Sequence, residues 1–357
     1  MNSNTSAYGP DHLASNHSTK RIEYIDALRG LVMVMVVFHH VGDCWGIIGL
    51  NVSIHEYLLQ LIIPTFFFIS GFVLYRDVTW NAAHIIDFFR KKVTLLLIVP
   101  FLFFVLFIHG ESIIDQFCDH FKQRYWFTFV LFDFYVFYAV IHFCIRKWWS
   151  DIVLVALGVF LYFINHSVIY DSIPLPELVK GMLSVKGWNY FIFFALGTLA
   201  KKHFVYVENW LKNSYFLAVC ILFYFLVNGF SKSVIDENSA LCLPLSISAI
   251  IVLFAFFRNN QGLFRKETVV GGTLQYIGKR TLDVYLIHIF LLPYNLEFIS
   301  VFKEHPMPVI EATVSLIIAG IIIAFSLVIS NIVRLSPLLA HWLFGAKLPP
   351  KSTNTPS

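Results

Sequence analysis

The sequence predicts an all-α polytopic membrane protein with about ten transmembrane helices and with both termini in the cytoplasm. Hydrophobic residues make up 58% of the 357 residues, and the mean hydropathy is +0.71. Charged residues make up only 13%, against about 25% in a typical soluble domain. Apolar stretches of bilayer-spanning length recur between short polar breaks, and Lys and Arg are distributed unevenly among those breaks.

Ten apolar stretches have the length of a membrane-spanning helix, roughly 17–25 residues. They lie near 27–48, 57–75, 92–109, 126–145, 151–168, 188–200, 213–230, 240–257, 281–298 and 310–333. The sixth is short and the ninth is the most polar. We find no internal repeat and no long soluble insertion, so residues 21–346 are expected to form one membrane domain.

The basic residues predict the orientation of these helices, because Lys and Arg gather in cytoplasmic loops. With the N-terminus inside, six of the 26 basic residues fall on outer segments: Lys122, Arg124, Lys180, Lys186, Lys232 and Lys303. The remaining 20 fall on inner segments, and every inner segment contains some. An even number of spans then places both ends of the chain in the cytoplasm.

The two ends of the chain are polar. Residues 1–20 lack the apolar region of a signal peptide, and residues 347–357 are rich in Pro, Ser and Thr. We expect both to be disordered tails and the first apolar stretch to be an uncleaved signal anchor. Five scattered cysteines without CxxC spacing predict neither a disulfide framework nor a metal site. A net charge of +4 does not indicate a nucleic-acid partner.

The first apolar stretch carries ionisable residues, which are costly in a bilayer and are therefore candidates for function. Arg29 and His40 are eleven residues apart, so on a helix they share one face about 16 Å apart along the axis. Asp26 lies one turn before Arg29 on the same stripe, whereas His39 points about 100° away. An interfacial ion pair and a packed neutral histidine are the alternative interpretation.

Later stretches add further candidates. In the second stretch Ser70 and Gly71 interrupt an apolar helix, which is also typical of ordinary small-residue packing. In the ninth, Tyr285 and His288 share a face, and His288 alone is equally consistent with a structural histidine. Trp126 lies where an interfacial aromatic belt is expected, while Asp133 inside the fourth stretch needs a partner.

A basic cluster precedes the third stretch on the side predicted to be cytoplasmic. It consists of Arg90, Lys91 and Lys92. Positive-inside anchoring explains such a cluster, and an anion site for phosphate or pyrophosphate is the functional alternative.

Four segments resemble motifs of the acyltransferase 3 family of integral membrane acyltransferases, in family order and across most of the chain. They are YIDALRGLVMVMVVFHH, PTFFFISGFVLY, RYWFT and IGKRTLDVYLIH. Arg29 and His40 have the family's spacing of an arginine and a histidine, and His39 does not. Arg124 stands where the third motif usually has histidine, and Thr281 stands for serine. The family's second arginine after Arg90 is absent, and Lys91 and Lys92 follow instead.

The resemblance implies an enzyme that moves an acyl group, commonly acetyl, from cytoplasmic acyl-CoA to a hydroxyl of a glycan or lipid-linked sugar. Such chemistry needs a base near the hydroxyl and positive charge for the developing oxyanion. We therefore expect His40 as general base, Arg29 as thioester or phosphate contact and Asp26 as its orienter. The basic cluster would bind the acyl-CoA co-substrate, and the cavity would be lined by Ser70, Trp126, Tyr285 and His288. No bound cofactor is expected.

Two other classes of function remain open from the sequence. A proton-coupled secondary transporter or flippase could use His40, His288 and Asp133 as a proton relay. A structural or sensor protein could use the same polar residues to pack helices. The acyltransferase hypothesis predicts one cavity, open to the cytoplasm, that is lined by Arg29, His40, Ser70 and His288.

Overall fold

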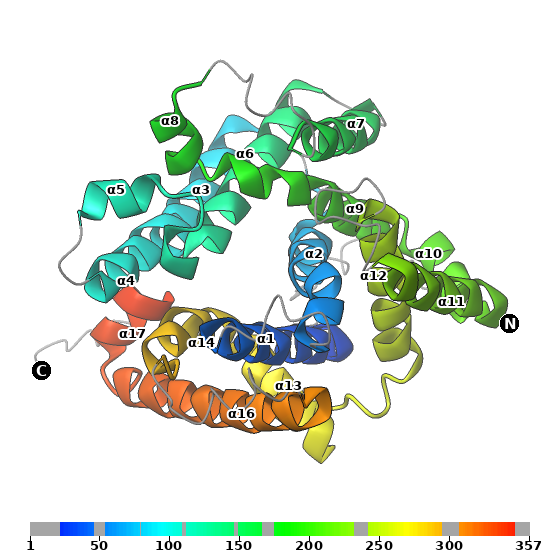
Figure 1. Cartoon of the computed structure of the whole chain (residues 1–357). Coiled ribbons are helices and arrows are strands. Elements are labelled where there is room, and N and C mark those ends of the chain that lie inside the picture. Colours follow the sequence, from blue (N-terminus) through cyan, green and yellow to red (C-terminus); the bar gives the residue numbers. More distant parts are fainter. Residues whose placement is uncertain are drawn as a thin grey trace, which may run out of the picture.

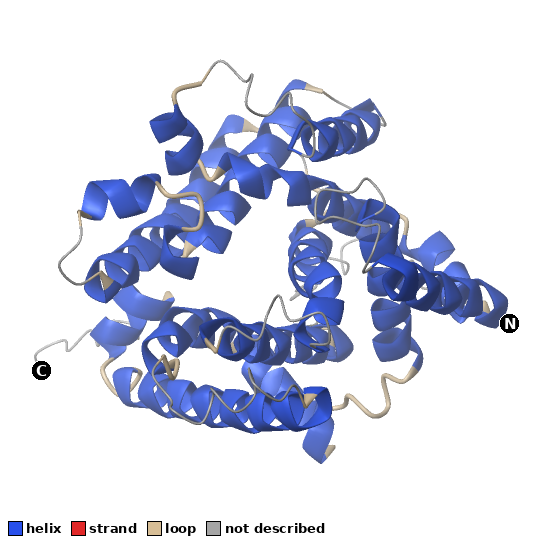
Figure 2. Cartoon of the chain, in the orientation of Figure 1, coloured by secondary structure: helices blue, strands red, loops and turns tan. Residues whose placement is uncertain are grey.

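The computed structural model describes residues 22–45, 54–78, 80–108, 112–145, 149–165, 175–231, 242–294 and 307–346. Within these ranges all regular structure is helical, and no strand occurs (Figures 1 and 2). The predicted all-α class is confirmed for this part of the chain. The predicted tails, 1–20 and 347–357, lie outside the described residues.

The helices follow one another with short connections. In chain order they are α1 (Glu23–Cys44), α2 (Ile54–Leu74), α3 (Ala82–Val93), η1 (Thr94–Ile98), α4 (Val99–Phe107), α5 (Ile113–Cys118), η2 (Lys122–Arg124), α6 (Trp126–Cys144), α7 (Trp149–Asn165), α8 (Glu177–Met182), η4 (Val185–Tyr190), α9 (Phe191–Lys202), α10 (Phe204–Lys212), α11 (Ser214–Ser231), α12 (Cys242–Asn259), α13 (Val269–Lys279), α14 (Thr281–Ile287), η5 (His288–Leu291), α16 (Pro308–Val333) and α17 (Pro337–Phe344).

Four of the described helices are long and apolar enough to cross a bilayer: α1, α6, α12 and α16. The pair α10 and α11, bent by 78° at its junction, would make a fifth. Other expected spans are shorter or broken here; the stretch near 92–109, for example, is divided among α3, η1 and α4. The protein is thus a multi-pass helical membrane protein, while ten spans and cytoplasmic termini stay predictions.

Helix α1 lies between α16 and α2 and is largely buried (Figure 1). Its most extensive contact is with α13, and it also packs on α2, α12 and α16. Gly30 and Gly278 make the α13 contact possible, because a Cβ on either would come within 2 Å of a backbone oxygen across the interface. The close approach fixes which face of α1 remains for the cavity described below.

Helix α2 runs back along α1 and is fixed by α9 on its other side. Gly71 of α2 and Gly197 of α9 lie at this contact, and a Cβ on Gly71 would be 2.0 Å from the carbonyl oxygen of Phe194. Phe72 of α2 and Tyr24 of α1 both contact the ring of Phe254. The end of α2 therefore lies beside the beginning of α1.

Residues 82–107 form one rod whose middle is a π-helix, η1. Asn81 caps its start by accepting a hydrogen bond from the backbone N–H of His84 at 2.9 Å. Pro100 follows η1 and lacks the N–H that a regular α-helix would need, which favours a widened turn before it. The π-helix changes the helical phase, and Leu95 and Leu96 within it line the cavity.

Candidate active site

A cavity of about 1210 Å³ runs along α1 from Arg29 to Asp43. Fourteen residues of helix separate these two side chains, or about 21 Å along the axis. The cavity exceeds the ~300–1,000 Å³ typical of small-ligand sites, so it offers room for two substrates. Its walls come from α1, α2, the α3–η1 rod, α6 and α14, and from residues 116–124.

The cavity brings together seven of the ten residues singled out in the sequence. The seven are Arg29, His40, Ser70, Lys91, Lys92, Trp126 and Tyr285. The other three, Asp26, Arg90 and His288, do not line it. Asp26 is 4% exposed, with its backbone against Gly278 of α13, and Arg90 is exposed.

Three histidine side chains, those of His39, His40 and His288, meet beside the cavity toward its Asp43 end. His40 lines the wall, and His288 is fully buried behind it, with ring centroids 5.4 Å apart and planes inclined by 29°. His288 Nδ1 lies 3.0 Å from the carbonyl oxygen of Val284. A carbonyl only accepts, so Nδ1 carries the proton and Nε2 of the neutral ring keeps its lone pair.

The neighbouring His39 also lines the cavity, with its ring 5.8 Å from that of His40. The side chains of His39 and His40 point about 100° apart around the axis of α1. Both line the cavity because its wall curves around the helix. Within the described part of the chain, Nδ1 of each has no hydrogen-bond partner. Both side chains are partly exposed and line the cavity, and His40 is the one packed on His288.

The end of the cavity near Arg29, here the Arg29 end, combines cations with aromatic rings. Arg29, Arg76 and Lys92 line it together with Trp80, His84, Phe88 and Tyr135. The rings pack edge to face: the centroids of Trp80 and Phe88 are 5.3 Å apart, and those of Phe88 and Tyr135 5.5 Å. Such an arrangement suits a ligand with an anionic group and a flat ring.

The three residues of the predicted anion cluster differ in what they face. The Lys92 ammonium lies over the rings of Tyr135, at 4.9 Å, and Phe88, at 5.6 Å, and has no acidic partner among the described residues. Lys91 is exposed and bonds Asp87 at 2.9 Å. Lys92 therefore presents an uncompensated positive charge to the cavity. The charge of Lys91 is neutralised by Asp87, and Arg90 does not line the cavity.

The opposite end, here the Arg124 end, is built around an ion pair. Arg124 donates to the Asp43 carboxylate at 2.5 Å and to the Tyr294 hydroxyl at 3.3 Å. Burial by itself would lower the pKa of Arg124, but the hydrogen bond to Asp43, together with the neighbouring Cys44, Tyr294 and Asp43 groups, outweighs it and raises that pKa above its ordinary value. The guanidinium is therefore permanently charged.

A second cation, Lys122, fixes the backbone at this end. Its side chain is fully buried, and Nζ donates to the Gly181 carbonyl at 2.6 Å and to Ser184 Oγ at 2.8 Å. Burial lowers the pKa of Lys122 from 10.5 to about 8. These contacts tie η2 to the segment around α8.

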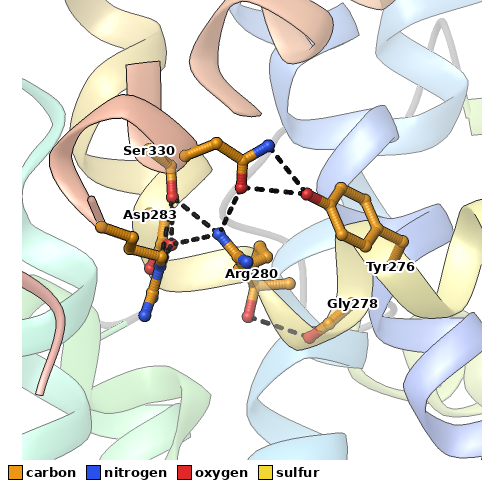
Figure 3. Close-up of polar contacts among 8 residues, drawn as sticks. Tyr276, Gly278, Arg280, Asp283 and Ser330 are labelled. Carbon is orange, nitrogen blue, oxygen red and sulfur yellow. Dashed lines mark hydrogen bonds and ion pairs between the residues drawn. The ribbon is translucent and has the colours of Figure 1, made fainter. Parts of the chain in front are cut away.

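Helix α14, which carries Tyr285 and is followed directly by His288 of η5, is fastened at its start to α16. Figure 3 shows Asp283 surrounded by Ser330, which donates to it at 2.5 Å, and by Arg280. Arg334 completes the set at 2.7 Å, and Asp283 itself is 2% exposed. This network holds the break between α13 and α14 and so positions the two side chains beside the cavity.

Asp133 finds a partner outside the cavity. Its carboxylate accepts a hydrogen bond from Trp188 Nε1 at 2.9 Å, and it is absent from the cavity wall. The proposed relay of His40, His288 and Asp133 is therefore not assembled as a unit. No group of three His, Cys, Asp or Glu side chains converges as metal ligands would in the described ranges.

Sequence reasoning did not single out the aromatic wall of the Arg29 end. His84 and Phe88 are four residues apart on α3 and share one face, while Trp80 precedes the Asn81 cap and contacts the ring of His84. That spacing was a usable signal, although it is equally typical of packing. Tyr135 could not have been found, because it comes from α6, far along the chain.

The sequence was compared with protein families, curated proteins and solved structures. The model of the acyltransferase 3 family, described as an acyltransferase domain, matches residues 22–330. No curated protein and no solved structure matches. The matched range contains the cavity and all ten residues singled out above, and the chain belongs to the acyltransferase 3 family of membrane acyltransferases.

Proposed function

We propose that the protein transfers an acyl group, acetyl in the first instance, from cytoplasmic acyl-CoA to a hydroxyl of a cell-envelope glycan or lipid-linked sugar. The enzyme would act in the inner (plasma) membrane and need no bound cofactor. The observation that carries the proposal is the single cavity that joins a cationic, aromatic end to His40. Membership of the acyltransferase family supports the reaction type.

The Arg29 end fits the nucleotide part of acyl-CoA. Lys92, Arg76 and Arg29 offer positive charge for the phosphates, and Trp80 and Phe88 offer ring faces and edges for the purine. The predicted topology places this end at the cytoplasmic side, where acyl-CoA is found. Asp26 would act on Arg29 from its buried position one turn earlier.

The Arg124 end fits a hydroxylated acceptor. Gln116, Asp119 and Gln123 line it with amide and carboxylate groups, which exchange hydrogen bonds with sugar hydroxyls. Phe121 and Trp126 add aromatic surface, with ring centroids 6.3 Å apart. A glycan entering here and a thioester entering from the Arg29 end would meet at the histidines.

In this scheme His40 removes the proton of the acceptor hydroxyl as its oxygen attacks the thioester carbon. The carbon–sulfur bond then breaks, and the thiolate takes the proton from His40, so that ester and free CoA leave. His288 supports the ring of His40 through their stacked contact. Ser70 lines the wall, but its hydroxyl already donates to the Phe66 carbonyl at 2.8 Å, which favours a packing role.

The test is acyl transfer by the purified protein in liposomes with labelled acetyl-CoA and a membrane glycan fraction. We expect transfer by the wild type and a loss of about 10²–10⁴-fold in His40→Ala, the usual contribution of a general base. His203→Ala, at a half-exposed histidine outside the cavity, is the matched control. An inactive wild type, or a fully active His40→Ala, would refute the proposal.

The transporter alternative gains no specific support from the site. It needs Asp133 in contact with the histidines, whereas Asp133 bonds Trp188. The same liposomes separate the two functions, because a transporter would move a substrate across the membrane without acetyl-CoA.

A further inference from the structure

Acyl transfer needs positive charge where the carbonyl oxygen becomes an oxyanion, close to the base. The sequence predicted Arg29 as a thioester or phosphate contact, but Arg29 is eleven residues, or about 16 Å, from His40 along α1. Asp43 is three residues, or about 4.5 Å, past His40 on the same helix. The guanidinium of Arg124, bound to Asp43 at 2.5 Å, is thus the cation nearer to the histidines.

Electrostatics points to the same residue. Among the described cations, Arg124 is the one whose charge acts on all three imidazoles, those of His39, His40 and His288. The cations of the Arg29 end, such as Lys92 and Arg76, lie toward the other end of the cavity. Arg124 alone of the cavity cations is both beside the histidines and permanently charged.

The backbone around Arg124 is strained. Lys122, Gln123 and Arg124 have φ angles of 42°, 50° and 74°, so three successive residues without a glycine adopt the left-handed conformation. Each such residue is strained and persists only where its surroundings fix it. Such strain is typical of functional sites.

Two anchors fix this segment. Lys122 is clamped by Gly181 and Ser184, as described above, and the hydroxyl of Tyr285 donates to the Arg124 carbonyl at 3.1 Å. The second anchor links Arg124 directly to α14, the helix that precedes His288. The position of Arg124 relative to the histidines is therefore set from both of its sides.

The guanidinium keeps hydrogen-bonding capacity for a ligand. It has five N–H groups, and Asp43 and Tyr294 occupy one each, with a weaker contact to Cys44 Sγ at 3.9 Å. About a quarter of the side chain, 23%, is exposed, and it lines the cavity. Asp43 orients the guanidinium, so that its remaining N–H donors are already in place before a substrate binds.

We propose that Arg124 is a catalytic residue that stabilises the oxyanion formed on the thioester carbonyl. This inference rests on the proposed acyl transfer. As the acceptor oxygen bonds to the acyl carbon, its proton passes to His40 and the carbonyl electrons move to the oxygen beside Arg124. When the carbonyl re-forms, the carbon–sulfur bond breaks and the thiolate receives the proton from His40. Asp43 is then a positioning residue for Arg124.

The experiment measures kcat and the KM of both substrates for Arg124→Gln in liposomes. Removing one oxyanion donor costs about 10²–10³ in kcat, and we expect that loss with both KM values within threefold of the wild type. Arg265→Gln, at an exposed arginine outside the cavity, is the matched control and should retain wild-type kinetics. Thermal unfolding of Arg124→Gln checks that the variant folds.

Chemical rescue supplies a second readout that a structural role would not produce. Guanidinium ion at a non-denaturing concentration should restore part of kcat to Arg124→Ala and leave Arg265→Gln unchanged. A normal kcat with a raised acceptor KM in Arg124→Gln would make Arg124 a binding residue and overturn the inference. Absence of any transfer by the wild type would instead refute the proposed function itself.

Discussion

Replacing Lys92 with methionine tests how the cavity recognises the donor. The ammonium lies over two aromatic rings at the Arg29 end and has no acidic partner among the described residues. A hydrogen bond to a charged group contributes about 1.5–3 kcal/mol. Lys92 is partly exposed, so the lower part of that range applies, and about 1.4 kcal/mol corresponds to a factor of ten.

We therefore expect Lys92→Met to raise the KM for acetyl-CoA about tenfold with little change in kcat, because the phosphate contact is lost equally in ground and transition states. Initial rates with labelled acetyl-CoA in liposomes measure both constants. Acetyl-pantetheine, which carries no phosphate, provides the internal control and should react equally with both proteins.

The neighbouring residues provide graded comparisons. Lys91→Met should raise the KM less, because Asp87 already neutralises that charge, and Arg90→Met should change it less than threefold. Lys266→Met, at an exposed residue outside the cavity, serves as the matched control. The reasoning is refuted if Arg90→Met weakens the donor as much as Lys92→Met, or if Lys92→Met also slows acetyl-pantetheine.

Two predictions concern stability. Gly71→Ala places a Cβ 2.0 Å from the Phe194 carbonyl oxygen, so α2 and α9 must separate by about 1 Å, and overpacking of this kind costs about 1–3 kcal/mol. The Tm of this variant in detergent should therefore fall. The Tm of Gly320→Ala should not, because a Cβ there meets nothing within 4 Å. The second rests on Lys122, whose pKa in the fold is about 8 against 10.5 in the unfolded chain, so that its charged form is disfavoured by about 3 kcal/mol below pH 8. Between about pH 8 and 10.5 the unfolded chain holds more protons, and the wild type should become more stable relative to Lys122→Met as pH rises; a difference independent of pH would show that Lys122 is not buried as a cation.

The sequence predicted the helical class because long apolar stretches have one stable solution in a bilayer. It was less informative about where those stretches break. The stretch near 92–109 contains Pro100, which signals an irregularity, but the π-helix at Thr94–Ile98 depends on what packs around it. The break at Arg280 likewise depends on partners in α16, about fifty residues later.

The candidate site was predictable where its residues share one helix. Arg29 and His40 lie on one stripe of α1 because helical geometry sets their angle, and the cavity follows that stripe. The partners of α1 were not predictable in the same way. Lys92 faces the cavity and Arg90 does not, although both belong to one run of basic residues, because the neighbours of α3 decide which of its faces is turned to the cavity.

The amino-acid sequence by itself determined the class of protein, the family motifs and the polar stripe of α1, because composition and helical periodicity are local properties. The tertiary structure decided which side chains meet. His288 lies behind His40 because α13 and α14 pack on α1, and Arg124 reaches Asp43 because distant anchors hold Lys122, Gln123 and Arg124 in a conformation that none of the three favours. Contacts between segments so far apart depend on packing of the whole chain, which no local pattern encodes.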